Sequence, residues 1–522
     1  MSKVDDWRPQ VNPWFIAATM VLPTFMVALD TSVANVALPH IAGSLSAGAD
    51  EATWVLTSYL VANAIVLPVS GWITQVVGRR RFLIISIIVF TLSSLASGAA
   101  VTLDMIIAAR VIQGASGGAL LPVSQAILLE SFPQEKRGEA MAVYALGVIV
   151  APVVGPTLGG WITDNYTWRW VFYINLPVCL LAIMLTRLLI EDPPYIQAES
   201  PKSVDYVGFA LMAAGLGGVQ IVLDRGERAD WFSSSWVLLV CLISAACLLC
   251  FVIWELNTEE PIVDLRVLVD RNFAVGVVMA TAYGIILYGT LVMLPLFLQN
   301  LMGYTALESG LAISPRGIGA LVSVVIAGRL LRGADGRIMI VIGFMVLAIA
   351  SFLLGEVNLL ISIGSIIWPN VIMGLAVGMI FVPLTTIAMG SLPNEMMGTA
   401  TGLYNLMRGM GGSVGIAVVT TLLARHTQLH QSMMVYHLTP YNPAFQESLH
   451  KFTGLFSSCG DSVIAMKKAY RHIYDILLAQ SSLMAYIDNF RLIGFFSFVG
   501  IPMAFLFKSV TSRKGMGSVI VD

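Results

Sequence analysis

Long apolar stretches alternate with short polar loops along almost the whole chain. A helix of about 20 apolar residues is long enough to cross the ~30 Å hydrocarbon layer of a membrane. Fourteen such stretches are present, at residues 14–38, 53–74, 82–101, 105–129, 139–162, 169–190, 205–224, 235–256, 273–299, 307–331, 338–356, 362–391, 397–424 and 487–508. This pattern predicts an all-α polytopic membrane protein with fourteen transmembrane helices.

The composition agrees with a membrane protein and excludes an ordinary soluble one. The 522 residues are 57% hydrophobic and 11% charged, whereas soluble proteins carry about 25% charged residues. The net charge of −2 and the lack of a long basic run give no indication of a nucleic-acid partner. Most cysteines lie in apolar runs without nearby histidines, so neither a metal nor another cofactor is expected.

Basic residues in the short loops are distributed unevenly between the two sides of the predicted bundle. One side holds Arg79, Arg80, Arg81, Lys136, Arg137, Arg187, Lys202, Arg266, Arg271, Arg329, Arg332 and Arg337. The other side holds Arg169, Arg225 and Arg228. Since positive residues accumulate in cytoplasmic loops, both termini are expected in the cytoplasm, and the basic tail with Lys508, Arg513 and Lys514 agrees. The acidic start of the chain is unlike a signal peptide, so the first apolar run should remain as a span.

The two ends of the chain resemble each other at a separation of about 257 residues. Gly71 and Gly328 both lie at the inner end of a span and precede basic residues, and Gly155 matches Gly412. An internal repeat of this kind predicts two six-helix halves with two inserted spans between them, and a substrate cavity at their interface near the middle of the membrane. The predicted units are residues 1–190, 191–272 and 273–522.

Small residues recur every fourth position in the stretch GVIVAPVVGPTLGG. The ridge consists of Gly147, Ala151, Gly155 and Gly159, with Pro152, Pro156 and Gly160 beside it. Such spacing lets another helix approach closely, and the prolines leave carbonyl groups that a neighbouring helix must cover. An ordinary tightly packed membrane helix is the alternative. The combination resembles the fifth-span signature of antiporters in the major facilitator superfamily, where this ridge would seal the closed outward path.

Asp30 is the carboxylate that lies well inside a predicted span, and an ionisable group there is a functional candidate. It stands about nine residues before Pro39, ~13 Å below the outer end at 1.5 Å per residue, and Arg110 lies ~9 Å deep by the same count from Asp104. We therefore hypothesise that Asp30 and Arg110 meet. The pair would act as a proton switch, because movement of Arg110 or arrival of substrate would change the charge state of Asp30. A fixed ion pair that holds two helices together is the alternative.

The stretch GWITQVVGRRR ends the second predicted span. Its candidate gate residues are Gly71, Gly78, Arg79 and Arg80. Simple positive-inside anchoring would explain the arginines alone, but the whole stretch resembles the superfamily loop that latches the inner gate. Gln75 stands where that pattern usually has Asp, which puts a charge-relay latch in doubt; in the second half Arg332 takes the equivalent position and Asp335 follows.

Residues 425–486 form an outside segment of roughly 60 residues that holds five of the six histidines. Long ordered loops are usually functional. His426 and His430 are four residues apart, but a third metal ligand in register is missing, so a metal site is not expected. Polar helices that dock on the pump itself or on an adaptor protein are the favoured interpretation.

Polar and aromatic residues of the spans that flank the half interface are candidates for the substrate cavity. They are Asn35, Trp54, Tyr59, Gln125, Tyr283, Tyr288, Gln299, Asn405 and Arg408. Apolar pockets with a few polar groups suit amphipathic drugs, although many of these aromatic residues would serve equally in helix packing. Two arginines, Arg316 and Arg408, lie deep in the predicted spans, whereas only one acidic residue does. This excess of positive charge predicts tolerance of neutral or anionic amphiphiles.

Several further stretches, including WVFYINLPV, LDRGERADWFSS, WELNTEEPIVDL and NPAFQ, complete a resemblance over nearly the whole chain to the EmrB-type multidrug exporters, a fourteen-span family of drug/proton antiporters. The resemblance implies the major facilitator fold and a bacterial inner-membrane pump. Driven by the proton gradient, the pump would export lipophilic compounds together with a periplasmic adaptor and an outer-membrane channel. A proton-coupled importer or exporter of one metabolite, such as a siderophore or fatty acid, is the alternative. An enzyme is not expected, because no nucleophile, base or metal cluster is present.

Overall fold

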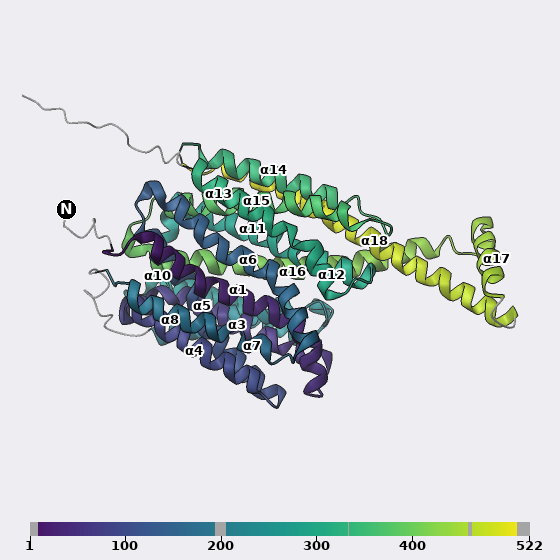
Figure 1. The fold of residues 1–522 in the computed structure, drawn as a ribbon, viewed down its shortest axis with the longest axis horizontal. Helices are drawn as coiled ribbons and strands as arrows, with labels where there is room; N and C mark the ends of the chain where they lie inside the picture. The colour runs from purple at the N-terminus through teal and green to yellow at the C-terminus, as the bar shows by residue number, and fades with distance from the viewer. Residues whose placement is uncertain (1–8, 194–204, 332, 458–461, 509–522) are drawn as a thin grey trace, which may run out of the picture.

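The computed structural model describes residues 9–193, 205–331, 333–457 and 462–508. Within these residues every regular element is helical, and fourteen helices are long and apolar enough to cross a membrane. Figure 1 shows most of them side by side in one bundle, with part of α16, α17 and part of α18 projecting beyond one end. The predicted all-α membrane fold with fourteen spans is confirmed.

The first six spans follow the predicted order. They are α1 (Pro13–Ser44), α3 (Trp54–Val77), α4 (Arg79–Ala99), α5 (Leu103–Ser131), α6 (Arg137–Asn165) and the pair α7 (Trp170–Tyr173) and α8 (Asn175–Leu189), with the short α2 (Ala49–Ala52) after α1. The predicted span 169–190 is therefore interrupted at Ile174. Pro177 gives the reason, because it has no N–H to bond the carbonyl group four residues earlier.

The remaining spans begin with the inserted pair α9 (Tyr206–Arg225) and α10 (Ser235–Asn257). The second half comprises α11 (Arg271–Leu296), a π-helical turn at Phe297–Leu301, α12 (Ala306–Ile313), α13 (Pro315–Leu330), α14 (Gly336–Leu354), α15 (Ile363–Met389), α16 (Met397–Val435), α17 (Pro443–Ser457) and α18 (Ser462–Ala504). The predicted span 307–331 is broken at Ser314. Pro315 has no N–H to bond the carbonyl group of Leu311, and the Ser314 hydroxyl donates to that carbonyl oxygen at 3.0 Å instead.

The outside segment predicted at residues 425–486 is not a separate loop. The helix α16 has 39 residues and α18 has 43, so at 1.5 Å per residue both exceed a ~30 Å hydrocarbon layer by about a factor of two. The predicted spans 397–424 and 487–508 therefore correspond to the apolar parts of two longer helices. The projecting ends carry α17, which packs on α18 through Phe445, Leu449, Ala469 and Ile473.

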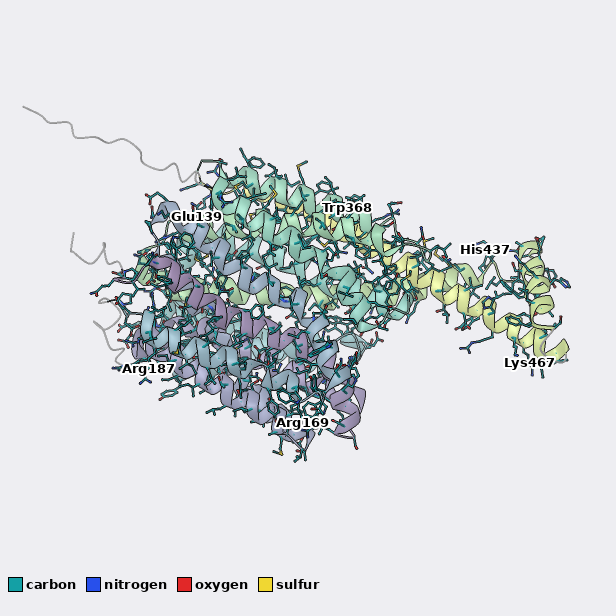
Figure 2. The ribbon with its side chains drawn as sticks, in the orientation of Figure 1. Glu139, Arg169, Arg187, Trp368, His437 and Lys467 are labelled. Atoms are coloured by element: carbon teal, nitrogen blue, oxygen red, sulfur yellow. The ribbon has the colours of Figure 1, made fainter. Side chains whose placement is uncertain are left out.

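The bundle has two ends, the Arg79 side and the α17 side. The Arg79 side contains the ends of α3 and α5 and the starts of α4 and α6, and Figure 2 shows Glu139 and Arg187 there. The α17 side is the opposite end, where Figure 2 shows Arg169, with His437 and Lys467 on the projection. Some residues used for the predicted topology lie outside the described residues, namely Lys202, Arg332, Arg513 and Lys514.

Candidate functional site

Asp30 and Arg110 meet in the interior of the first half, as the sequence predicted. A terminal nitrogen of Arg110 lies 2.5 Å from Oδ2 of Asp30, and both side chains are fully buried. Asp30 comes from α1 and Arg110 from α5. The ion pair therefore joins two helices at a place that water does not reach in this conformation.

Two amide side chains complete the surroundings of this carboxylate. The Nε2 of Gln113 donates to Oδ1 of Asp30 at 2.9 Å, and the Nδ2 of Asn175 donates to the same oxygen at 2.7 Å. Arg110 also donates to Oε1 of Gln113 at 2.9 Å and to the carbonyl oxygen of Val55 at 3.2 Å. A carboxylate can accept several hydrogen bonds, and in this Asp30 pocket, made of Asp30, Arg110, Gln113 and Asn175, both carboxylate oxygens accept from buried donors.

Aromatic rings cover the guanidinium group of Arg110. It lies 4.2 Å from the ring centre of Tyr59 and 5.6 Å from that of Phe172. A Cβ on Gly114 would be 2.3 Å from the carbonyl oxygen of Tyr59, so the glycine allows α5 to approach α3 this closely. The second terminal nitrogen of Arg110 has no hydrogen-bond partner among the described residues, which leaves one donor for a different arrangement.

The small-residue ridge of α6 packs along α1, next to the Asp30 pocket. A Cβ on Gly147 would lie 2.5 Å from the Thr24 hydroxyl, one on Gly155 would lie 2.3 Å from the Ser32 hydroxyl, and one on Gly159 would lie 3.0 Å from the Val33 side chain. Ala151 and Gly160 are also buried on this helix.

One carbonyl group freed by the prolines of α6 is covered by the neighbouring helix. Pro156 has no N–H for the carbonyl of Pro152, four residues earlier, and the Ser32 hydroxyl donates to that carbonyl oxygen at 3.4 Å. Another face of α6 contacts the second half, where a Cβ on Gly310 would be 2.6 Å from the Thr157 hydroxyl. The helix thus connects α1 with the other half.

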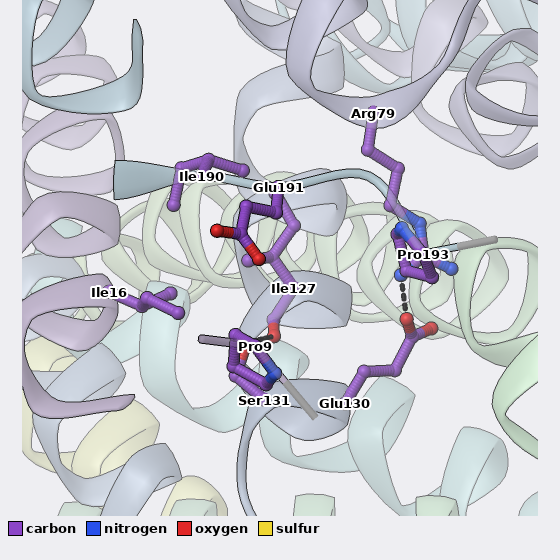
Figure 3. Close-up of a pocket in the computed structure, with 9 residues that line it drawn as sticks. All are labelled: Pro9, Ile16, Arg79, Ile127, Glu130, Ser131, Ile190, Glu191 and Pro193. Atoms are coloured by element: carbon purple, nitrogen blue, oxygen red, sulfur yellow. Dashed lines mark hydrogen bonds and ion pairs between the residues drawn. The ribbon is translucent and has the colours of Figure 1, made fainter. Parts of the chain in front are cut away.

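The Arg79 side carries an ion pair that the sequence did not indicate. Arg79 pairs with Glu130 of α5, and both side chains are buried (Figure 3). The backbone N–H of Arg80 donates to Oδ1 of Asp192 at 2.8 Å, and Gly78 has a φ of 89°, which favours glycine. Gln75 is exposed, and the acidic partners of this stretch are Glu130 and Asp192 instead.

The two halves touch at the Arg79 side. A Cβ on Gly71 in α3 would be 2.6 Å from the backbone nitrogen of Thr399 in α16. Arg137 of α6 donates to Oδ1 of Asn394 at 3.0 Å, just before α16. The backbones of α3 and α16 are therefore in contact, and the Arg79 side is closed in this conformation.

Deeper in the bundle, polar groups of the two halves meet again. Nδ2 of Asn405 donates to Oε1 of Gln125 at 2.5 Å. The rings of Tyr144 and Phe381 are stacked with their centres 6.3 Å apart, and the guanidinium of Arg408 lies 5.3 Å from the centre of the Phe381 ring. Three of the predicted cavity residues, Gln125, Asn405 and Arg408, are therefore close to the half interface.

The other predicted cavity residues are distributed over the molecule. Asn35 and Gln299 are exposed. Trp54 stacks with Arg225 of the inserted helix α9 at 4.5 Å. Tyr59 belongs to the surroundings of Arg110, Tyr283 is buried in α11, and Tyr288 packs against Gly412. Tyr283 and Tyr288 therefore share the surroundings of Arg408, whereas Trp54 and Tyr59 lie against other arginines.

Comparisons with known proteins agree with this geometry. The family model described as Major Facilitator Superfamily matches residues 20–416. The chain belongs to the major facilitator superfamily. This superfamily member is 38% identical to the multidrug export protein EmrB of Haemophilus influenzae over 84% of this chain and 85% of that protein. It is also 38% identical to the fatty acid resistance protein FarB of Neisseria gonorrhoeae, over 83% and 85% of the two chains.

A solved structure supports the fold of this superfamily member. The proton:xylose symporter XylE superposes with a TM-score of 0.60 at 14% identity, covering 95% of this chain and 99% of that one. Together the family, the relatives and the fourteen membrane helices identify an EmrB-like drug efflux transporter that crosses the inner membrane many times. Its family and its relatives make it a transporter and not an enzyme.

Four polar residues around these sites in the transporter were not predicted as site residues. Gln113 and Asn175 hold the Asp30 carboxylate, whereas Glu130 and Asp192 hold the Arg79 loop. Glu130 had the appearance of a span-end acid, but the structure buries it. One signal was available, since a buried arginine predicts acceptor groups nearby.

The motif LDRGERADWFSS contacts both halves of the transporter. Asp224 accepts a hydrogen bond from Thr57 in the first half. On the second half, Trp231 Nε1 donates to the Thr421 hydroxyl at 3.0 Å. Just before the motif, Gln220 of α9 accepts from Ser413 at 3.0 Å. The inserted helix α9 therefore lies across the α3–α16 seam near the α17 side.

Proposed function

We propose that this efflux transporter is a drug/proton antiporter in which Asp30 carries the coupling proton and Arg110 controls its charge. The observation that carries the proposal is the fully buried Asp30–Arg110 pair. A buried, ionisable group in a membrane span is costly and marks an ion or proton pathway in many transporters. The free terminal nitrogen of Arg110 supports a second arrangement in which the pair is broken and Asp30 is protonated.

In the proposed topology the Arg79 side and both termini face the cytoplasm, and α17 projects into the periplasm. The excess of basic residues in the short loops of the Arg79 side supports this orientation. Since the two halves touch at the Arg79 side, this conformation is closed toward the cytoplasm. Rocking of the halves would open the Arg79 side to collect substrate, in the way that transporters with internal repeats alternate access.

Proton movement tests the direction and coupling of transport. Everted vesicles, whose lumen is acidified by respiration, should release protons when a lipophilic export substrate is added. The measurement is the recovery of a quenched pH-sensitive dye, with vesicles from cells that lack the transporter as the control. Substrate-induced acidification of the lumen, or no response with a compound that binds, would contradict proton antiport.

We further propose that the projecting ends of α16 and α18, together with α17, dock a periplasmic adaptor that leads to an outer-membrane channel. The projection exposes large apolar side chains, with Tyr436 80% and Tyr441 94% accessible. Leu429 and Met433 of α16 are also exposed and precede Tyr436 at helical spacing, and an exposed apolar face of this kind is typical of interaction sites. The length of α16 and α18 places these residues beyond the membrane surface.

A double substitution tests the docking proposal. Tyr436→Ser with Tyr441→Ser should lower drug resistance of whole cells severalfold, because hot-spot aromatics dominate interfaces, while substrate-induced proton release in everted vesicles stays unchanged. The control is Tyr206→Ser, a tyrosine at the Arg79 side that is 74% exposed. Unchanged whole-cell resistance in the double variant would show that the projection does not dock a partner needed for export.

The alternative of transport restricted to one metabolite class has one observation in its favour. The chain is as similar to the fatty acid resistance protein FarB as to multidrug export proteins. A panel of lipophilic drugs and fatty acids in the proton-release assay separates the two functions. A response to fatty acids alone would favour the metabolite exporter.

A further inference from the structure

Two buried arginines of the second half have no acidic partner in the part of the chain that the structure describes. Arg316 in α13 is 3% exposed and Arg408 in α16 is 5% exposed. The ion pairs of the described residues include neither of them, whereas the buried Arg79 and Arg110 are each paired with a carboxylate. Since an uncompensated buried cation is costly, this pair of charges requires an explanation.

Arg408 is surrounded by aromatic residues from both halves. Tyr144 of α6, Tyr283 of α11 and Tyr404 of α16 interact with it electrostatically, and the Phe381 ring lies 5.3 Å away. A cation is attracted to such ring faces, but the rings bring no compensating negative charge. Their surface is apolar apart from the hydroxyl groups, which suits the body of an amphipathic molecule.

Arg316 lies close to the same cluster of aromatic residues. One of its terminal nitrogens donates to the Thr290 hydroxyl at 3.1 Å. A Cβ on Gly374 would lie 2.0 Å from the carbonyl oxygen of Arg316, so the backbone of α15 holds this part of α13 firmly. Tyr283 interacts electrostatically with both Arg316 and Arg408, and its buried hydroxyl has no hydrogen-bond partner among the described residues. Both arginines also contact α11 directly, since Thr290 accepts from Arg316 and a Cβ on Gly284, next to Tyr283, would lie 2.2 Å from the carbonyl oxygen of Arg408.

The cluster also lies at the surface that opens when the halves separate. Asn405 is one helical turn from Arg408 and bonds to Gln125 of the first half. Its Oδ1 and the Nε2 of Gln125 are buried without a partner among the described residues. Polar atoms left over at an interface are available to a ligand that enters when the interface parts.

We propose that Arg316 and Arg408 bind the anionic headgroup of an amphipathic substrate, a carboxylate or a phenolate, while the surrounding aromatic rings contact its apolar body. The inference rests on the proposed export function and names the substrate class of the site between the halves. A planar guanidinium holds a carboxylate through two parallel hydrogen bonds. The ligand would supply the negative charge that the protein does not provide at this place.

Binding to the purified transporter in nanodiscs of zwitterionic lipid tests this assignment. Three probes with the same chain differ in charge: decanoate at a pH where it is ionised, decanol and decyltrimethylammonium. The wild type should bind decanoate at least about tenfold more tightly than either other probe. Arg408→Gln and Arg316→Gln should each lose about tenfold in decanoate affinity and little in decanol affinity.

Controls separate a lost headgroup contact from damage to the fold. Arg329→Gln changes an exposed arginine on the same helix as Arg316 and should bind like the wild type. Arg408→Lys keeps the charge and should retain part of the decanoate preference. Equal losses of decanoate and decanol affinity in folded Arg408→Gln protein would overturn the assignment, as would equal wild-type affinity for decanoate and decyltrimethylammonium.

An anionic lipid has the same headgroup chemistry as the proposed substrate, so a separate binding experiment must test it. Adding phosphatidylglycerol to the nanodiscs should leave decanoate binding unchanged, because a lipid headgroup lies at the membrane surface and the two arginines lie deep in the bundle. Displacement of decanoate by this lipid would assign the site to lipid and overturn the substrate assignment. Binding requires no proton gradient, so the two proposals can fail independently. If the transporter prefers the anion but fails the proton-release test, the antiport proposal is rejected and the anion-binding assignment stands.

Discussion

Asp30→Asn should abolish substrate-induced proton release in everted vesicles while leaving substrate binding within a few-fold of the wild type. Asparagine has nearly the same shape as aspartate, but it has no carboxylate to protonate. Its side-chain oxygen can still accept from Gln113, Asn175 or Arg110, all of which donate to Asp30 now. The measurements are dye recovery for proton release and equilibrium binding of the same compound.

A control and a charge swap separate coupling from helix attachment. Asp104→Asn removes an exposed carboxylate from the helix that carries Arg110 and should behave as the wild type. If Asp30→Arg combined with Arg110→Asp restores full proton release, the pair is a structural clip. Unimpaired proton release in Asp30→Asn would move the coupling site elsewhere, with the buried Glu130 and Glu255 as the next candidates.

The contact between Asp30 and Arg110 could be predicted because both residues lie at known distances from a span end. Depth along a helix follows from 1.5 Å per residue, and a buried charge needs a partner. Gln113 and Asn175 could not be selected in this way, because amides occur in many spans and their rotation about the helix axis decides what they face. The structure supplies that rotation.

The cavity candidates show the same limit more clearly. Gln125, Asn405 and Arg408 face the half interface, whereas Asn35 and Gln299 are exposed. All five lie in predicted spans at plausible depths. A membrane helix that is apolar on every side carries a weak signal for which face is buried, so depth was predictable and direction was not.

The boundaries of the last two long helices also escaped prediction for a physical reason. Hydropathy marks where a helix leaves the hydrocarbon, not where it ends. The polar continuation of α16 to Val435 and the start of α18 at Ser462 therefore had the appearance of one outside loop. The lengths of the apolar parts were enough to predict the number of spans. They did not predict how far α16 and α18 extend beyond the membrane.

The candidate proton site and the anion site lie in different parts of the transporter. Asp30 and Arg110 belong to helices of the first half, whereas Arg316 and Arg408 belong to the second. Coupling between them must pass through the contacts between the halves. The helix α6 is placed to do this, since its ridge packs on α1 beside Ser32 while Thr157 contacts Gly310 and Tyr144 stacks on Phe381.

Gly71→Val should disable export by preventing closure of the Arg79 side. The new Cβ would lie 2.6 Å from the backbone nitrogen of Thr399 and 2.7 Å from the carbonyl carbon of Gly398, and backbone cannot move aside as a side chain can. Overpacking of this kind costs roughly 1–3 kcal/mol, which shifts the balance between closed and open conformations about 5- to 150-fold. Transport should fall by about tenfold or more.

Labelling measures the same shift directly. In a background without the native cysteines, Thr401→Cys places a thiol at a buried position of α16 near the Arg79 side. Gly71→Val should make it react with a membrane-impermeant maleimide from that side. Gly409→Val is the matched control, because a Cβ there meets no atom within 4 Å. If Gly71→Val transports normally and Thr401→Cys stays protected, closure does not depend on the approach of α3 to α16. The latch would then be sought in the Arg79–Glu130 pair and the Arg137–Asn394 contact.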